Sequence, residues 1–321
     1  MTVPAPTLRV PAMSVPVDHF DTEVLHRHWI PLSATDTETA AVLRERLGVD
    51  FATARNRVWE TDNFLYFPVV ANYKRGDRVE RETIVFALGA EFLVTLQPAD
   101  HFPPFDKAVA KMRRTPTLAA SPHGVMYALL WALNEASERV IHYASDALEA
   151  MNDEIEMATK GYDHRGREIG VADMRGTMFR MNAAEEIVSR TQETQLQLAR
   201  AARHLMAETP CHIGDLDGLI PILIADIDGV KQHAGFEHDK VRYLQQSVMT
   251  WLDVKQNQIV KVFTIITAVF LPPTLIATFY GMNFTWMPEL EWQHGFLATT
   301  LMTLVAAVIP LVYIKRKGWL R

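Results

Sequence analysis

Residues 259–314 read IVKVFTIITAVFLPPTLIATFYGMNFTWMPELEWQHGFLATTLMTLVAAVIPLVYI. They contain two apolar runs, 259–280 and 296–314, each with about the 20 residues that a helix needs to cross a bilayer's hydrocarbon layer. Residues 281–295, between the runs, are enough to turn the chain round and little more. We therefore expect an integral membrane protein with two C-terminal transmembrane helices and the rest of its chain on one side of the membrane.

The composition of the 321 residues limits the classes of protein to which this chain can belong. Mean hydropathy is close to zero, so the membrane-spanning part is a minority of the chain. A formal net charge of -6 argues against a nucleic-acid partner, which needs a basic face. The single cysteine, Cys211, excludes an intrachain disulfide framework and suits a reducing compartment. No nucleophile–base pair or phosphate-binding glycine loop stands out, so we expect neither an enzyme nor an organic cofactor.

Basic residues near the apolar runs predict the orientation in the membrane. They gather at the ends away from the short loop: Lys255, Lys261, Lys315, Arg316, Lys317 and Arg321. The loop 281–295 has no Lys or Arg and carries Glu289 and Glu291. By the positive-inside rule, both termini are expected in the cytoplasm and the loop outside. Residues 1–20 lack the apolar segment of a signal peptide, and we expect a flexible tail there.

Strand patterns predict an α/β domain in the first third of the chain. β-Branched and aromatic residues are frequent in 63–73 and 81–97, and Gly89 and Ala90 divide the second segment into a hairpin. Residues 36–47 have the pattern of a helix, with Asp36 or a threonine available as its cap.

Long helices are expected after Pro122, where the strand signals disappear. Residues 125–160 and 174–207 each predict a helix of about 35 residues. A third helical pattern begins near Pro221 and continues to Tyr280, on the order of 90 Å, so that one helix would run from the cytoplasm into the membrane. The expected order is a flexible tail (1–20), a cytoplasmic α/β domain (21–122), a long-helix stalk (123–258), the first transmembrane helix (259–280), an external loop (281–295), the second transmembrane helix (296–314) and a basic cytoplasmic tail (315–321).

One face of the first transmembrane run is largely polar at helical spacing. Its positions follow steps of three and four: Asn257, Val260, Thr264, Thr267, Leu271, Thr274, Thr278 and Gly281. We call these eight residues the polar seam, because this period keeps one face turned toward partner helices. Threonines in membrane helices also bond back to their own backbone, so a water-filled path and plain helix packing are both open at this point. Two helices per chain cannot enclose a path, so a path requires a closed ring of subunits.

The same run carries two further predictions. Pro272 and Pro273 remove backbone donors, which loosens the helix there and frees carbonyl oxygens that could face a path. Away from the seam the surface is apolar, as at Ile259, Val262 and Leu275, and suits lipid or the second transmembrane run.

The triplet Gly281-Met282-Asn283 follows the first run directly, and MPEL (287–290) and Trp292 come after it in the loop. Together these residues resemble the CorA family of magnesium and cobalt channels, most closely over 257–321. The resemblance implies a homopentamer with a funnel-shaped cytoplasmic part and a pore lined by the first transmembrane helix. It also implies passive uptake of Mg²⁺, and of Co²⁺ and Ni²⁺, driven by the membrane potential.

The resemblance assigns roles to particular residues. Ion selection falls to Gly281, Met282 and Asn283. Pore positions fall at Asn257, Pro272 and Thr274, and hydrophobic constrictions at Val260, Phe263 and Leu271. Phe263 is bulkier than the aliphatic residue typical of the family and lies one residue from the seam, so the gate is assigned only to within one position.

A ring of Asn283 amides suits the chemistry of Mg²⁺. This ion gives up its water shell reluctantly, and neutral amide oxygens accept hydrogen bonds from that shell without stripping it. Glu289 and Glu291 would concentrate cations at the mouth.

For regulation, the resemblance leads us to expect acidic residues that bind Mg²⁺ between cytoplasmic domains, and the candidates are Asp215, Asp217, Asp226 and Asp228. An acidic ring that the family has near the cytoplasmic mouth falls here at the neutral Gln246.

Two alternatives compete with a magnesium channel. One is a Zn²⁺ transporter of the same superfamily, although the 12 histidines are scattered and none forms a Cys/His set with zinc spacing. The other is a non-conducting pentameric membrane scaffold or sensor, which the neutral Gln246 and the bulky Phe263 would suit. In every case the expected partners are copies of the same chain, divalent ions and membrane lipid.

Overall fold

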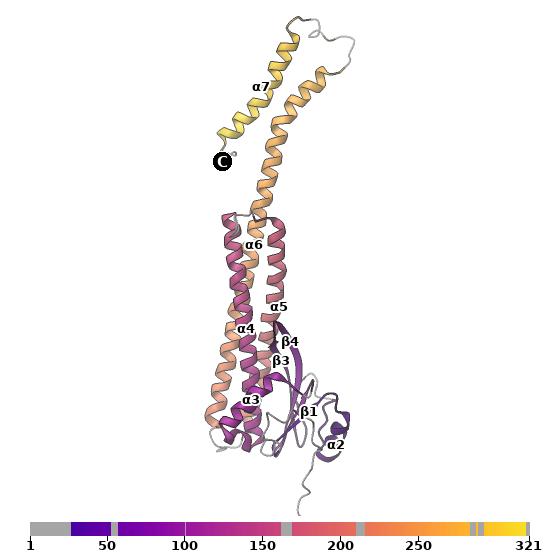
Figure 1. The fold of residues 1–321 in the computed structure, drawn as a ribbon, viewed down its shortest axis with the longest axis vertical. Coiled ribbons are helices and arrows are strands. Elements are labelled where there is room, and N and C mark those ends of the chain that lie inside the picture. The colour runs from indigo at the N-terminus through magenta and orange to yellow at the C-terminus, as the bar shows by residue number, and fades with distance from the viewer. Residues whose placement is uncertain are drawn as a thin grey trace, which may run out of the picture. The chain divides into compact units, whose positions relative to one another are not determined.

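A computed structural model describes residues 27–52, 57–99, 101–161, 169–209, 216–282, 287 and 292–318 (Figure 1). The chain divides into two compact units. The first unit comprises Met1–Glu154 and Thr177–Leu244, and the second comprises Ile155–Gly176 and Gln245–Arg321.

The first unit contains a five-stranded mixed sheet. Its strands are β1 (Trp29–Ser33), β2 (Trp59–Glu60), β3 (Leu65–Arg75), β4 (Arg78–Leu88) and β5 (Leu93–Gln97), in the order β1-β5-β4-β3-β2. β1 pairs with β5 in parallel, and the other pairs are antiparallel. The expected strands and the hairpin break at Gly89 are therefore confirmed, whereas β1 and β2 were not predicted.

An apolar core covers each face of the sheet, and the side chains of β3 alternate between the two cores. Phe67 and Val69 point into a core shared with the long helices, and Tyr66 lies in a second core. That second core includes Leu43 of α2 (Thr37–Leu47). Asp36 caps α2, as expected: its carboxylate accepts from the Thr39 amide at 2.9 Å.

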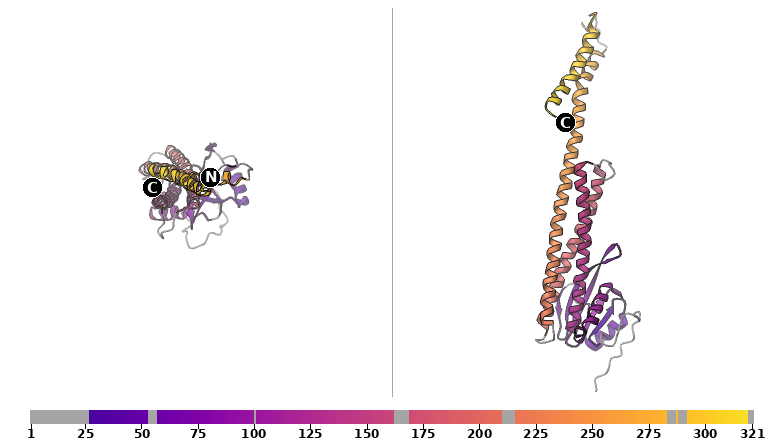
Figure 2. Two further views of the ribbon diagram at one scale, coloured as in Figure 1. Left: turned by 90° about the horizontal axis from the view of Figure 1, so that it is seen from above. Right: turned by 60° about the vertical axis from the view of Figure 1, so that its left-hand side comes forward.

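The remaining helices are α3 (Pro103–Arg114), the 3-10 helix η1 (Pro116–Ala120), α4 (Pro122–Lys160), α5 (Val171–Glu208), α6 (Leu216–Tyr280) and α7 (Gly295–Arg316). The predicted long helices α4, α5 and α6 each begin a few residues earlier than expected, whereas α3 and η1 were not predicted. In the first unit, α4, α5 and α6 lie side by side (Figures 1 and 2). The expected continuity of the third long helix is confirmed, since α6 has 65 residues with no break at Pro272. The fold class, an α/β domain followed by long helices and two apolar C-terminal helices, is confirmed.

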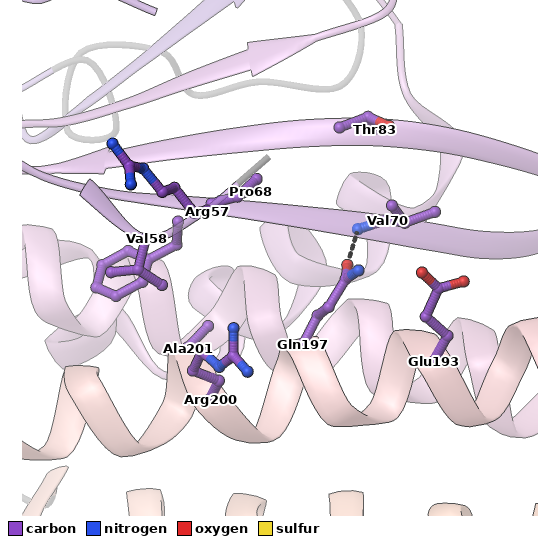
Figure 3. A pocket seen from close by; sticks show the side chains of 10 residues that line it. Arg57, Val58, Pro68, Val70, Thr83, Glu193, Gln197, Arg200 and Ala201 are labelled. Atoms are coloured by element: carbon purple, nitrogen blue, oxygen red, sulfur yellow. Dashed lines mark hydrogen bonds between the residues drawn. The ribbon is translucent and has the colours of Figure 1, made fainter. Parts of the chain in front are cut away.

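Helix α5 protects the open edge of β3. β2 pairs with Leu65 and Tyr66, and in the part of the chain that the structure describes no other strand lies on that side of β3. The Val70 amide instead donates to Gln197 Oε1 at 2.6 Å, as Figure 3 shows. Between the sheet and α5 lies a cavity of about 260 Å³, lined on the α5 side by Glu193, Gln197 and Arg200.

Candidate ion path

The two apolar runs form helices that the chain itself leaves uncovered. α6 and α7 each contain an 18-residue window apolar enough to cross a membrane. Only 0% and 6% of these windows is buried, whereas the core helix of a soluble protein would be mostly buried. α7 runs back antiparallel to the end of α6 (Figure 1).

All eight residues of the polar seam are exposed, seven of them on α6 and Gly281 directly after its end. The half-buried residues of the same segment form a different row: Lys261, Ile265, Ala268, Val269, Pro272, Pro273, Ile276 and Tyr280. At about 100° per residue, this row is turned well over 90° away from the seam. On α7, the less exposed positions recur at helical spacing and most are small, which suits close helix packing in lipid: Gly295, Thr299, Thr303, Ala306, Ala307, Pro310 and Ile314. Packing within the chain therefore leaves the seam open.

Three seam threonines bond to their own helix. The hydroxyl of Thr264 donates to the Val260 carbonyl at 2.8 Å, and that of Thr278 donates to the Thr274 carbonyl at 2.7 Å. Thr274 does the same to Phe270, at 2.7 Å. Such bonds use the hydroxyl proton and leave oxygen lone pairs as acceptors. The seam can thus both satisfy its donors and accept hydrogen bonds from the water shell of a cation.

The proline pair leaves two backbone acceptors without their helical donors. Pro272 and Pro273 have no amide hydrogen, so the carbonyls of Ala268 and Val269 receive no helical bond from them. The helix continues through this point. Two carbonyl oxygens near the middle of the span therefore keep unused acceptor capacity.

Phe263 lies at the border of the seam. Its side chain is 67% exposed, and it lines a groove with Ile169, Gly170 and Val262. The neighbouring Thr264, which belongs to the seam, does not line this groove. The Phe263 ring therefore faces the groove, and the next residue along the helix belongs to the seam.

The backbone at the first position of the triplet favours a glycine. After α6 ends at Tyr280, the Gly281 amide donates to the Ala277 carbonyl at 3.0 Å. A Cβ atom at Gly281 would lie 3.1 Å from that same oxygen, closer than side chains normally tolerate. Met282 is exposed, while Asn283, Glu289 and Glu291 lie outside the described residues.

The family model described as "CorA-like Mg2+ transporter protein" matches residues 27–316. The chain belongs to the CorA family.

Relatives within the CorA family match nearly end to end. The magnesium transport protein CorA of Escherichia coli K12 is 29% identical over 304 residues, covering 91% of this chain and 92% of the relative. That of Salmonella typhimurium is 28% identical over 303 residues, with the same coverage.

Solved structures share the fold. The complete CorA magnesium transporter from Methanocaldococcus jannaschii has a TM-score of 0.68 at 17% identity, covering 91% of this chain and 90% of its own. The full-length CmaX protein has a TM-score of 0.59 at 18% identity, covering 91% and 88%. The ZntB cytoplasmic domain from Vibrio parahaemolyticus has a TM-score of 0.52 at 12% identity, covering 71% and 88%. These identities are low, so the likeness is one of fold.

The acidic residues suggested by the CorA resemblance do not meet within one chain. Asp217 and Asp226 are exposed, Asp228 is half-buried beside Lys231, and Asp215 lies outside the described residues. Among the described residues, no group of three or more His, Cys, Asp or Glu is placed to hold a metal ion. A regulatory site built from these residues therefore stays a prediction that needs a second subunit.

Asp226 sits in a mixed-charge environment. The pKa of Glu135 is raised mainly by burial. The negative charge of Glu138 raises this pKa further, and that of Asp226 adds a smaller effect. Burial lowers the pKa of Lys111, and Glu135 and Asp226 oppose that shift.

The sequence reasoning missed the anchor of α6 just before its transmembrane part. The indole of Trp251 is buried and donates to the Ala158 carbonyl at 2.9 Å, joining α6 to the end of α4. The ammonium of Lys255 lies over the same indole, 5.5 Å from its centre. The signal for this anchor in the sequence was the spacing of Trp251 and Lys255, which lie four residues apart just before the apolar run.

Proposed function

We propose that this CorA-family chain assembles as a homopentamer that conducts Mg²⁺ into the cytoplasm through a path lined by the polar seam. The observation that carries the proposal is the seam itself. It is exposed, it can accept hydrogen bonds, and it leads directly into Gly281-Met282-Asn283. The magnesium transport function in the names of the bacterial relatives supports the same ion.

Passive entry needs no chemical energy source. A divalent ion moving into a negative interior gains roughly 4–5 kcal/mol per 100 mV. Glu289 and Glu291 gather cations at the outer mouth, and a ring of Asn283 amides selects the hydrated ion. The seam threonines then accept hydrogen bonds from its water shell. Co²⁺ and Ni²⁺ have similar hydrated shells and pass by the same path.

The proposal places both termini in the cytoplasm of a bacterial cell and the 281–295 loop outside the inner membrane. Cytoplasmic Mg²⁺ closes the path by binding between subunits, with Asp217, Asp226 and Asp228 as candidate ligands together with Asp215.

The test is ion flux into proteoliposomes that contain the purified full chain. Mg²⁺, Co²⁺, Ni²⁺ and Zn²⁺ are supplied outside, at a negative-inside potential, with and without Mg²⁺ inside. We expect Mg²⁺ entry that increases with the potential and falls when the interior holds Mg²⁺. Entry of Zn²⁺ alone would assign the chain to zinc transport, and no entry of any ion would make it a scaffold or sensor.

A further inference from the structure

The cavity between the sheet and α5 gathers hydrogen-bond donors from separate parts of the first unit. Arg57 precedes β2, Thr83 lies on β4, and Gln197 and Arg200 lie on α5. Figure 3 shows Arg57 on the side of the strands and Arg200 on the side of the helix. Guanidinium, amide and hydroxyl groups all carry donors, and a guanidinium carries no acceptor. The cavity therefore suits a ligand that is mainly an acceptor.

The amide of Gln197 is oriented by the edge of β3. Its Oε1 accepts from the Val70 amide at 2.6 Å, as the dashed line in Figure 3 marks. Because the backbone donor identifies this atom as the oxygen, the other end of the amide is the Nε2 group, which carries two hydrogens. Gln197 thus adds donors to the lining of the cavity.

The positive charge at the cavity is not balanced by the acidic residue of its lining. Glu193 is paired with Arg81, at 2.7 Å. Within the part of the chain that the structure describes, neither Arg57 nor Arg200 forms an ion pair. The Arg57 guanidinium lies over the Trp59 ring, 5.0 Å from its centre, and such a contact leaves the charge unneutralised. Two guanidinium charges therefore face the cavity without a counter-charge.

The size and the charge of the cavity limit the class of ligand. Its volume of about 260 Å³ is below the roughly 300–1,000 Å³ of sites for drug-sized ligands, so the ligand is small. A carboxylate offers one charge and two oxygens in one plane, whereas a phosphate group offers up to two charges and three oxygens in different directions. Guanidinium groups on two sides of a cavity match the phosphate group better.

We propose that this cavity binds a small phosphate dianion, either inorganic phosphate or a phosphate monoester. Its oxygens accept from Arg57, Arg200 and Gln197. The carbon part of an ester lies against Val58 and Phe67, which form an apolar part of the wall. The whole site lies within one chain, so it depends neither on subunit number nor on ion conduction.

The test is isothermal titration calorimetry on the full chain in detergent, in buffer freed of divalent ions and at constant ionic strength. Inorganic phosphate and phenyl phosphate are titrated separately, and benzoate serves as a ligand with the same ring and a single charge. Arg57→Gln and Arg200→Gln each remove one proposed contact. The matched control is Arg203→Gln, which removes an exposed cation of α5 that does not line the cavity.

We expect saturable binding of phosphate that weakens about tenfold or more in Arg57→Gln and in Arg200→Gln, the effect of losing a hydrogen bond between charged groups. Arg203→Gln should bind as the wild type does, and benzoate should bind at least about tenfold more weakly than phenyl phosphate. Tighter binding of phenyl phosphate than of inorganic phosphate would identify an ester as the ligand, and the opposite order would identify the free ion.

Four results would overturn the proposal: no saturable binding of either phosphate, binding that survives both cavity variants, an equal loss in Arg203→Gln, or benzoate binding as tightly as phenyl phosphate. Circular dichroism checks that each variant is folded, and both cavity arginines are exposed, so their removal should leave the core intact. Binding is measured without an ion gradient. Loss of Mg²⁺ flux in the transport assay would therefore leave this inference standing, and the reverse also holds.

Discussion

Asn283 follows directly after Gly281 and Met282, at the outer end of the proposed path. Asn283→Ala should abolish Mg²⁺ uptake, because alanine offers no acceptor to the water shell of the ion. Native mass should be unchanged. Uptake is measured in proteoliposomes with a fluorescent Mg²⁺ indicator inside.

The matched control for Asn283 is Gln293→Ala, which removes an amide from the same loop outside the triplet. It should retain most of the uptake. Wild-type flux in Asn283→Ala would show that selection takes place elsewhere.

Phe263 and Thr264 offer two positions for the gate. If the exposed Phe263 rings meet near the axis, they block hydrated ions by dewetting. Phe263→Ala should then raise basal flux several-fold, and Thr264→Ala should change it little. Flux and native mass are measured on both variants. A Phe263→Ala protein that loses subunits without conducting more would place the ring between subunits instead.

The junction between η1 and α4 depends on the absence of a side chain at Gly124. A Cβ atom there would lie 2.3 Å from the Leu118 carbonyl oxygen, so the backbone would have to move. Gly124→Ala should destabilise the protein by about 2 kcal/mol. The matched control is Gly176→Ala on exposed α5 surface, where nothing lies within 4 Å and where alanine should stabilise by about 0.5–1 kcal/mol. Thermal unfolding by circular dichroism should move the two variants in opposite directions.

The N-terminal turn of α4 should be sensitive to acid through His123. Burial lowers the pKa of His123, and Glu208 only partly opposes that shift. The unfolded chain therefore takes up a proton near the ordinary pKa of about 6.5, while the folded chain does not. Stability is full above that pH and is lost as the pH falls below it.

The measurement for His123 is the midpoint of thermal unfolding between about pH 7 and pH 5. The midpoint of His123→Gln should fall less over this range than that of the wild type. Parallel curves for the two proteins would rule out His123 as the acid-sensitive group.

At the scale of the whole molecule, the open seam makes a prediction about assembly. Because the polar seam is exposed on a single chain, a path needs a ring of subunits, and the CorA resemblance implies that the detergent-solubilised protein should be a pentamer. Native mass spectrometry or light scattering gives the mass directly. A monomer or dimer under gentle conditions would remove the basis for the path.

The sequence by itself determined the features that depend on local pattern. Two runs long enough to cross a bilayer specified the transmembrane helices, and the choice between Asp36 and a threonine placed the start of α2 to within a residue or two. The triplet at 281–283, together with MPEL at 287–290, pointed to the CorA family, which the family match confirms. The roles of individual pore residues stay predictions, because they depend on other subunits.

Tertiary structure alone decided the features that join distant parts of the chain. β1 pairs with β5, as in Trp29 opposite Leu93, and no local period in the sequence indicates that partner. Likewise, no local period indicates that Gln197 contacts the edge of β3, or that Val171 and Lys255 line the same groove. Periodicity fixes which face of an element is apolar, but contacts across many residues depend on how the whole chain fills space.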